Sequence, residues 1–224
     1  MKPLSTIFRT NLIRVSLRLL IIVFIPGLVT VFVLISGCKK KETGESKPVV
    51  TLQNLEIAYS REMRIGREYS LFSKKAEKDH YSAVANLYKA ASRSEEIHAE
   101  MAATLLRSKG VEVNPYVPDS ISVGTVVQTL RLASSDEALE TESMYPNLAR
   151  TAELENFPEA AESFRKTLFA DRRHAELFKS MMDKRGSDHA SPYYVCPGCG
   201  YIITSEKVDE CPGCHLKKDR FEKI

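Results

Sequence analysis

The feature that most constrains this chain is a carboxylate and an imidazole on what should be the apolar face of a helix. Helical spacing places Val84, Tyr88, Ala91, Glu95, His98, Ala102 and Leu105 on one face. Glu95 and His98 interrupt that face near its middle. Because an unpaired charge in a protein interior is strongly unfavourable, these two side chains need partners there. One such pair alone does not distinguish a functional site from a polar core pair or a different helix register.

The same pattern occurs in three further segments. We predict helices over 51–78 and 81–109, a third helix after a loop at 111–118, and a fourth that begins at Pro158. Each carries acidic or imidazole groups among its apolar positions. The full set is Glu62, Glu95, His98, Glu137, Glu140, Asp171 and His174. Asp171-x-x-His174 repeats the spacing of Glu95-x-x-His98.

The ends of the third helix can also be predicted. Asp119 or Ser120 is a suitable cap for its first turn. Pro146 should kink the helix without ending it, because Leu148 and Ala152 continue the apolar spacing. The preceding loop is long enough for a crossover between helices that are not antiparallel neighbours.

The shared polar positions predict a pair of metal ions. A helix of 25 residues is about 40 Å long, and the polar positions lie near its middle, so antiparallel packing brings them to one level. Carboxylates gathered in a dry interior repel one another or take up protons. Two divalent ions remove the repulsion, and oxygen ligands mixed with imidazole suit iron or manganese. Acids from two helices and an acid-x-x-His pair from each of the other two resemble the ligand set of ferritin-like bundles, so we expect a mainly α protein with such a four-helix bundle.

A second metal site is predicted near the C-terminus. Cys196, Cys199, Cys211 and Cys214 follow the spacing C-x2-C-x11-C-x2-C, which is typical of four thiolates around one ion. Zinc and iron both accept this ligand set, and the spacing does not distinguish them.

The N-terminal segment predicts export. Residues 1–37 contain basic but no acidic residues and continue into an apolar run, which ends at Ile35-Ser36-Gly37-Cys38. This resembles a bacterial lipoprotein signal, in which the cysteine is lipidated. An uncleaved spanning anchor is the alternative, and both place the protein outside the cytoplasmic membrane. Much of the basic excess of the chain lies in this segment, so no basic patch argues for nucleic-acid binding.

The predicted organisation has four parts. A leader at 1–37 is followed by a polar tether at 38–50, the bundle at 51–186 and a small metal-knuckle domain at 191–224.

A carboxylate-rich helical bundle followed by a four-cysteine domain resembles the rubrerythrin family, over about residues 52–221. The family's first ligand motif is matched by Ser60-Arg61-Glu62, and its Met-Tyr-Pro by Met144-Tyr145-Pro146. The resemblance implies that all seven acidic and imidazole residues hold a di-iron site, with Tyr69 and Tyr145 hydrogen-bonded nearby. It also favours iron over zinc at the four cysteines, as a rubredoxin-like electron-transfer centre.

The resemblance implies an activity. Members of the family reduce hydrogen peroxide to water at the di-iron site, with electrons relayed from the Fe(Cys)4 centre, often across a subunit interface. We therefore expect a di-iron peroxidase that forms a homodimer and receives electrons from an unidentified donor. A membrane-anchored iron-binding or ferroxidase protein and a non-catalytic zinc-ribbon scaffold are the alternatives.

Three features depart from the family pattern. Asp171 is one methylene shorter than the family's Glu, which predicts a long contact with a metal or one weakly held metal. His215 stands where the second knuckle usually has Gly, which affects the N–H to sulfur bonds. The lipoprotein-like N-terminus differs from the cytoplasmic location better known for the family.

Overall fold

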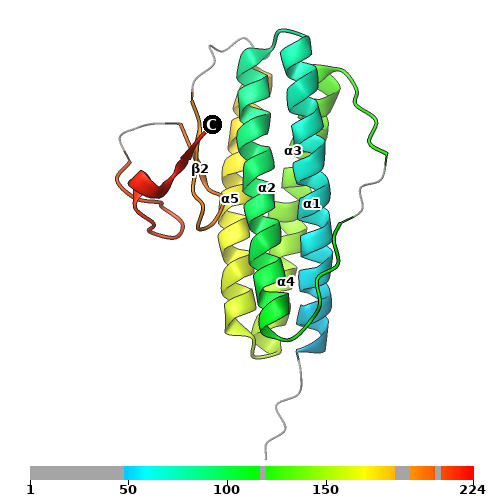
Figure 1. Ribbon diagram of the computed structural model, residues 1–224, viewed down its shortest axis with the longest axis vertical. Coiled ribbons are helices and arrows are strands. Elements are labelled where there is room, and N and C mark those ends of the chain that lie inside the picture. The colour runs from blue at the N-terminus through cyan, green and yellow to red at the C-terminus, as the bar shows by residue number, and fades with distance from the viewer. Residues whose placement is uncertain (1–47, 117–119, 185–191, 205–207) are drawn as a thin grey trace, which may run out of the picture. The chain divides into compact units, whose positions relative to one another are not determined.

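The structure is a computed structural model that describes residues 48–116, 120–184, 192–204 and 208–224. The helical part comprises α1 (Val49–Lys78), α2 (Ser82–Ser108), α3 (Val126–Leu139), the π-helical turn η1 (Glu140–Met144), α4 (Tyr145–Leu154) and α5 (Pro158–Asp183). The C-terminal part comprises β1 (Tyr194–Val195), β2 (Ile202–Ile203), the 3-10 helix η2 (Lys218–Arg220) and β3 (Glu222–Lys223). The predicted mainly α architecture with a small metal-knuckle domain is confirmed (Figure 1).

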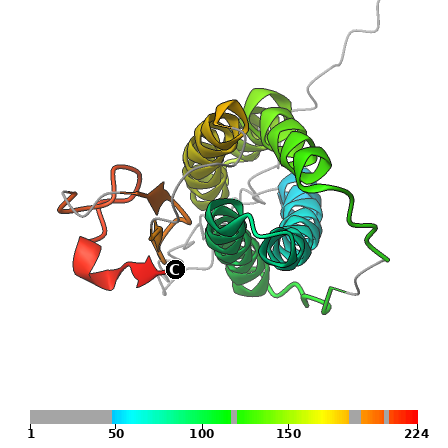
Figure 2. The same ribbon diagram turned by 90° about the horizontal axis from the view of Figure 1, so that it is seen from above.

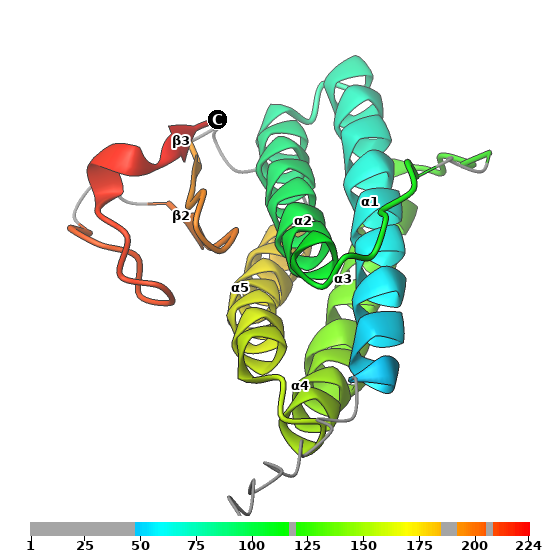
Figure 3. The same ribbon diagram turned by 60° about the horizontal axis from the view of Figure 1, so that its bottom comes forward.

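The helices form a four-armed bundle. Since α3, η1 and α4 follow one another without a break, they make a single arm, and the four arms surround a common interior (Figure 2). The neighbours are α1 with α2, α2 with α5, α5 with α3 and α4, and these with α1. Neighbouring arms run antiparallel, so α2 and α3, which lie diagonally opposite, run in the same direction (Figure 3). The connection between α2 and α3 is therefore a crossover, as its length suggested.

The start of α3 differs from the prediction. Its cap is Thr125, whose side chain accepts a hydrogen bond from the Gln128 backbone while the Gln128 side chain accepts one from the Thr125 N–H. Ser120 lies in the connection before the helix, and Asp119 lies outside the described residues. The cap prediction is wrong because this reciprocal pair, five residues further on, satisfies two helix-end donors at once.

As predicted, the third arm continues past Pro146. The π-helical turn η1 directly precedes α4, in which Pro146 occupies the first turn. A proline cannot donate a hydrogen bond to the preceding turn. π turns are rare and occur mostly as single turns inside α-helices, frequently at functional sites. Thr141 Oγ1 donates to the Glu137 carbonyl at 2.7 Å within this stretch. The π turn begins at Glu140, which is one of the predicted metal ligands.

Two apolar clusters fill the bundle above and below its middle. One contains Ile65, Tyr69, Phe72, Leu87, Tyr88 and Phe178, and the other contains Leu55, Leu106, Tyr145, Phe157 and Phe164. In every arm the polar positions lie between residues of these two clusters. The polar residues thus share one level that is shielded from solvent at both ends.

The C-terminal part contains a three-stranded antiparallel sheet with strand order β2-β1-β3. Tyr194 pairs with Ile203 on one side and with Lys223 on the other. The strands hold the two cysteine knuckles close together.

The leader 1–37, Cys38 and most of the tether lie outside the described residues. Among the residues that are described, no helix combines the length and apolarity needed to cross a membrane.

Candidate metal centres

All seven predicted bundle ligands point into the interior. Each of these seven residues is at most 2 % exposed. The residues are Glu62 on α1, Glu95 and His98 on α2, Glu137 on α3, Glu140 at the start of η1, and Asp171 and His174 on α5. The structure therefore brings acidic and imidazole groups from all four arms into one dry layer.

Six of the seven residues form two overlapping groups with metal-ligand spacing. Glu95, Glu137, Asp171 and His174 offer ligand atoms that all lie within 4.8 Å of one another, and Glu62, Glu95 and His98 do the same. Glu95 belongs to both groups. Its carboxylate is thus placed to bridge two neighbouring ions.

The histidines sit directly against the carboxylates. His98 Nδ1 lies 2.8 Å from Glu95 Oε2 and 3.4 Å from Asp171 Oδ1. His174 Nδ1 lies 3.2 Å from Glu95 Oε1 and 3.5 Å from Glu137 Oε1. Asp171, in spite of its shorter side chain, reaches the same group of atoms.

The contact of His98 Nε2 with Cys199 determines how His98 Nδ1, which faces Glu95, can bind. His98 Nε2 lies 3.1 Å from the carbonyl oxygen of Cys199, which can only accept a hydrogen bond. A proton on Nε2 leaves Nδ1 of the neutral ring without one, facing an acceptor oxygen of Glu95. Two acceptors at this distance need a proton or a cation between them, and His98 Nδ1 is the natural ligand atom.

Unpaired polar atoms concentrate in this layer. Among the described residues, the buried atoms without a hydrogen-bond partner include Glu62 Oε2, Glu95 Oε1, Glu137 Oε2, Glu140 Oε2, both oxygens of Asp171 and both nitrogens of His174. Buried polar atoms rarely lack partners in native proteins. Carboxylate oxygens and imidazole nitrogens without partners, which face one enclosed space from four arms, fit two divalent cations.

The electrostatics of the layer agree with this assignment. Burial raises the pKa of Glu62, Glu140 and Asp171 well above their usual values, and repulsion between the carboxylates raises it further. Burial alone would raise the pKa of Glu95 and lower that of His174. Instead, the two histidines lower the pKa of Glu95, and Glu137 with Glu95 raises that of His174 to about 10. Without cations the layer retains protons, which metal binding would displace.

Two tyrosines support the carboxylates from the flanking apolar clusters. Tyr69 Oη donates to Glu137 Oε1 at 2.8 Å, and Tyr145 Oη donates to Glu62 Oε1. Burial raises the pKa of both phenols well above its usual value, so both remain protonated donors. Each tyrosine therefore fixes one carboxylate oxygen and leaves the other free.

Glu140 has a partner that the sequence did not reveal. Its Oε1 accepts a hydrogen bond from Arg61 Nε at 2.7 Å, and Arg61 Nη2 lies 3.2 Å from Asp136 Oδ1. Helical spacing placed Arg61 outside the apolar face of the first helix, yet its side chain is only 17 % exposed. The guanidinium lies between α1 and the α3 arm, where it contacts both carboxylates.

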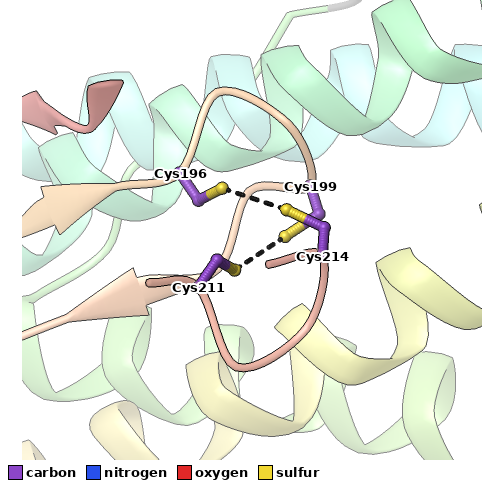
Figure 4. A group of neighbouring side chains, drawn as sticks. All are labelled: Cys196, Cys199, Cys211 and Cys214. Atoms are coloured by element: carbon purple, nitrogen blue, oxygen red, sulfur yellow. Dashed lines mark hydrogen bonds between the residues drawn. The ribbon is translucent and has the colours of Figure 1, made fainter. Parts of the chain in front are cut away.

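The four cysteines form the second centre (Figure 4). Cys196 Sγ lies 3.4 Å from Cys214 Sγ, and Cys199 Sγ lies 3.4 Å from Cys211 Sγ. Four sulfurs bonded tetrahedrally to one ion at about 2.3 Å stand roughly 3.8 Å apart, so the knuckles are already close to the required geometry.

Backbone groups of the knuckles point at the sulfurs. Hydrogen bonds from neighbouring sulfurs and from the Gly213 and Cys214 N–H groups lower the pKa of Cys211. His215 occupies the turn after the second knuckle with φ 59°, the conformation that Gly200 adopts at φ 78° after the first. The histidine is thus tolerated at the glycine position at the expense of backbone strain.

The two centres are in contact within one chain. In addition to the bond between His98 and Cys199, Ser94 Oγ donates to the Gly200 carbonyl at 2.6 Å. A Cβ atom on Gly200 would lie under 3.0 Å from Ser94 Oγ and His98 Nε2. Gly200 therefore allows the first knuckle to approach the bundle closely. Sequence spacing gave no sign of the role of Ser94.

Comparisons with known proteins agree with this geometry. The family model described as rubrerythrin matches residues 53–187. The chain belongs to the rubrerythrin family. It is 30 % identical to rubrerythrin-2 of Clostridium acetobutylicum, over 79 % of this chain and 97 % of that protein. It is 29 % identical to nigerythrin of Nitratidesulfovibrio vulgaris, over 79 % of this chain and 89 % of the relative.

Solved structures give the same result. The fully reduced, all-ferrous state of nigerythrin superposes with a TM-score of 0.73 at 30 % identity, covering 78 % of this chain and 86 % of that one. A bacterioferritin of Desulfovibrio desulfuricans shares the fold, with a TM-score of 0.58 at 17 % identity. As in the rubrerythrin family generally, the cofactors are a di-iron pair at the bundle layer and one rubredoxin-like iron at the four cysteines.

Proposed function

We propose that this protein is a di-iron peroxidase that reduces hydrogen peroxide to water, with the seven buried acidic and imidazole residues as the ligands of the two irons. The observation that carries the proposal is the pair of overlapping ligand groups joined by Glu95. A ferrous pair held there would supply two electrons, which together with two protons from the solvent reduce one peroxide to two water molecules.

The residues of the chain have defined tasks in this reaction. The apolar clusters on either side of the layer exclude bulk water and strengthen every charge interaction inside it. Tyr69 and Tyr145 keep their protons on Oη and hold Glu137 and Glu62 in fixed orientations. The ligand layer is thereby held in shape while its charge changes.

We further propose that electrons enter through the contact between Cys199 and His98. Cys199 belongs to the four-cysteine centre, and its carbonyl lies 3.1 Å from the ring of a bundle ligand. Only the cysteine backbone, one hydrogen bond and the imidazole ring separate the two centres along this path. The path lies within one chain, so it does not by itself need a second subunit.

A pair of matched variants tests the site. Glu95→Ala should abolish peroxide consumption by the reduced protein while the ferric-thiolate colour of the four-cysteine centre survives. Glu96→Ala is the control, because Glu96 is the next residue of α2 but is exposed and pairs with Arg93. Peroxide consumption by the Glu95 variant at the control rate would contradict the proposal, and so would rapid iron oxidation by O₂ with little peroxide turnover.

The relay has its own test. Cys199→Ser should leave a single turnover by chemically pre-reduced protein but stop repeated turnover with an external reductant. Sustained cycling by this variant would remove the four-cysteine centre from the path. Light scattering of the purified chain tests the predicted homodimer separately.

We also propose that the chain is held at the outer side of the cytoplasmic membrane by lipid on Cys38. The support is the sequence order of a basic segment, an apolar run and Ile35-Ser36-Gly37-Cys38. The lipid would keep the peroxidase close to the membrane.

A further inference from the structure

Glu140 stands apart from the other predicted ligands. It belongs to neither of the two groups whose ligand atoms lie close together. Its Oε1 is taken by Arg61 Nε at 2.7 Å, while its Oε2 is buried and has no hydrogen-bond partner among the described residues. Arg61 therefore holds Glu140 through one oxygen at a position outside both ligand groups.

Arg61 is itself fixed at its far end. Its Nη2 lies 3.2 Å from Asp136 Oδ1, one helical turn before Glu140, so the guanidinium joins two carboxylates of the α3 arm. Both side chains of this pair are largely buried, at 17 % and 14 % exposure. A charge-assisted hydrogen bond shielded from water is stronger than a surface ion pair, which contributes little.

The same helix places Arg61 beside the ligand group that Glu140 would join. Arg61 directly precedes Glu62, a member of the group formed with Glu95 and His98. A cation in this group thus lies next to a carboxylate that a guanidinium already holds.

We propose that Arg61 is a positioning residue that competes with the cation of the Glu62, Glu95 and His98 group for Glu140. This inference rests on the proposed function, because it requires cations in the bundle. While Arg61 holds Glu140, that cation has three protein residues as ligands. It gains Glu140 only by displacing the guanidinium. The cation position beside Arg61 is therefore the weaker of the two and the more adaptable in its ligands.

A titration with cobalt tests the proposal. The full-length chain first receives zinc at the four cysteines, and cobalt is then added stepwise. Calorimetry should resolve a tight and a weaker step in the unmodified chain. Arg61→Gln should tighten the weaker step by tenfold or more. The visible absorption per cobalt of that step should fall, because an added carboxylate raises the coordination number. Arg61→Lys, which keeps the charge but not the directed Nε–H, should lie between the two.

Two further variants make the result specific. Arg64→Gln removes the same charge one turn away, where the side chain pairs with Glu68 and approaches Asp136 only to 4.0 Å, so both steps should stay unchanged. Adding Glu140→Ala to Arg61→Gln should cancel the gain in affinity. Thermal melting of each variant without metal confirms that it is folded.

The outcomes separate this inference from the proposed function. If Arg61→Gln binds two cobalt ions with the affinities of the unmodified chain, or binds the second more weakly, Arg61 is only a structural ion pair. Equal tightening by Arg64→Gln would also overturn the inference. If the unmodified chain binds no cobalt in the bundle, the proposed function fails and the inference fails with it.

Discussion

Gly200 controls the contact between the four-cysteine centre and the bundle, and Gly200→Ala tests that contact. The residue has φ 78°, and an added Cβ would overlap Ser94 Oγ and His98 Nε2. The left-handed backbone costs an alanine about 1 kcal/mol. Overlap with two buried atoms costs about 1–3 kcal/mol more. If the four-cysteine domain separated from the bundle, the overlap would disappear. The two hydrogen bonds to the Cys199 and Gly200 carbonyls, each of which contributes about 1 kcal/mol, would then be lost.

We therefore expect the strain and the overlap together to disfavour the docked state of Gly200→Ala by about 2–4 kcal/mol, a factor of about 30 to 700 in population at 1.4 kcal/mol for each tenfold change. Repeated peroxide turnover with an external reductant should fall by a similar factor. A single turnover by pre-reduced protein and the ferric-thiolate spectrum should be retained.

Gly110→Ala is the matched control. Gly110 also has a left-handed backbone, with φ 74°, but a Cβ there would meet nothing within 4 Å. This variant carries the backbone strain without the overlap, so its repeated turnover should equal that of the unmodified chain. Full cycling by Gly200→Ala with its spectrum intact would refute the reasoning, and so would a loss of cycling in Gly110→Ala.

Three further predictions concern strain, protonation and location. His215→Gly should stabilise the second knuckle by up to about 1 kcal/mol, because glycine accepts the φ of 59° without strain, and slower release of metal to a chelator would show it. The raised pKa values of Glu62, Glu140 and Asp171 mean that the metal-free folded state binds more protons than the unfolded chain. Its free energy of unfolding should therefore fall as the pH rises from about 4.5, and its melting temperature should be lower at pH 8 than at pH 5. The fully metal-loaded chain should lack this fall, and a metal-free chain that becomes more stable over the same interval would contradict the prediction. Cys38→Ala should move the protein out of the membrane fraction if the cysteine is lipidated, whereas unchanged retention would favour a spanning anchor.

The bundle and its polar layer could be predicted because both follow from helical periodicity. A residue such as Glu62 or His174 at a position reserved for apolar side chains is visible in the sequence alone. The four-cysteine centre could be predicted for a similar reason, since its ligands come in two close pairs. Both patterns are local, and the fold only has to bring a few such segments together.

The features that escaped prediction depend on contacts between distant segments. Arg61 and Glu140 are 79 residues apart, and nothing in the sequence near Arg61 distinguishes it from Arg64 and Arg67 of the same helix. Ser94 and Gly200 are 106 residues apart. The Thr125 cap is different, because its partner Gln128 lies three residues away and the local pattern was present in the sequence.

The most direct test of the whole account is the iron content per chain after anaerobic reconstitution with ferrous iron. The account predicts three irons in the unmodified chain, of which two are lost in Glu95→Ala and one in a variant without the four cysteines. The irons of the bundle should then be oxidised by one equivalent of peroxide. One iron per chain in the unmodified protein, bound only by the cysteines, would contradict the claim that the polar layer holds a metal pair.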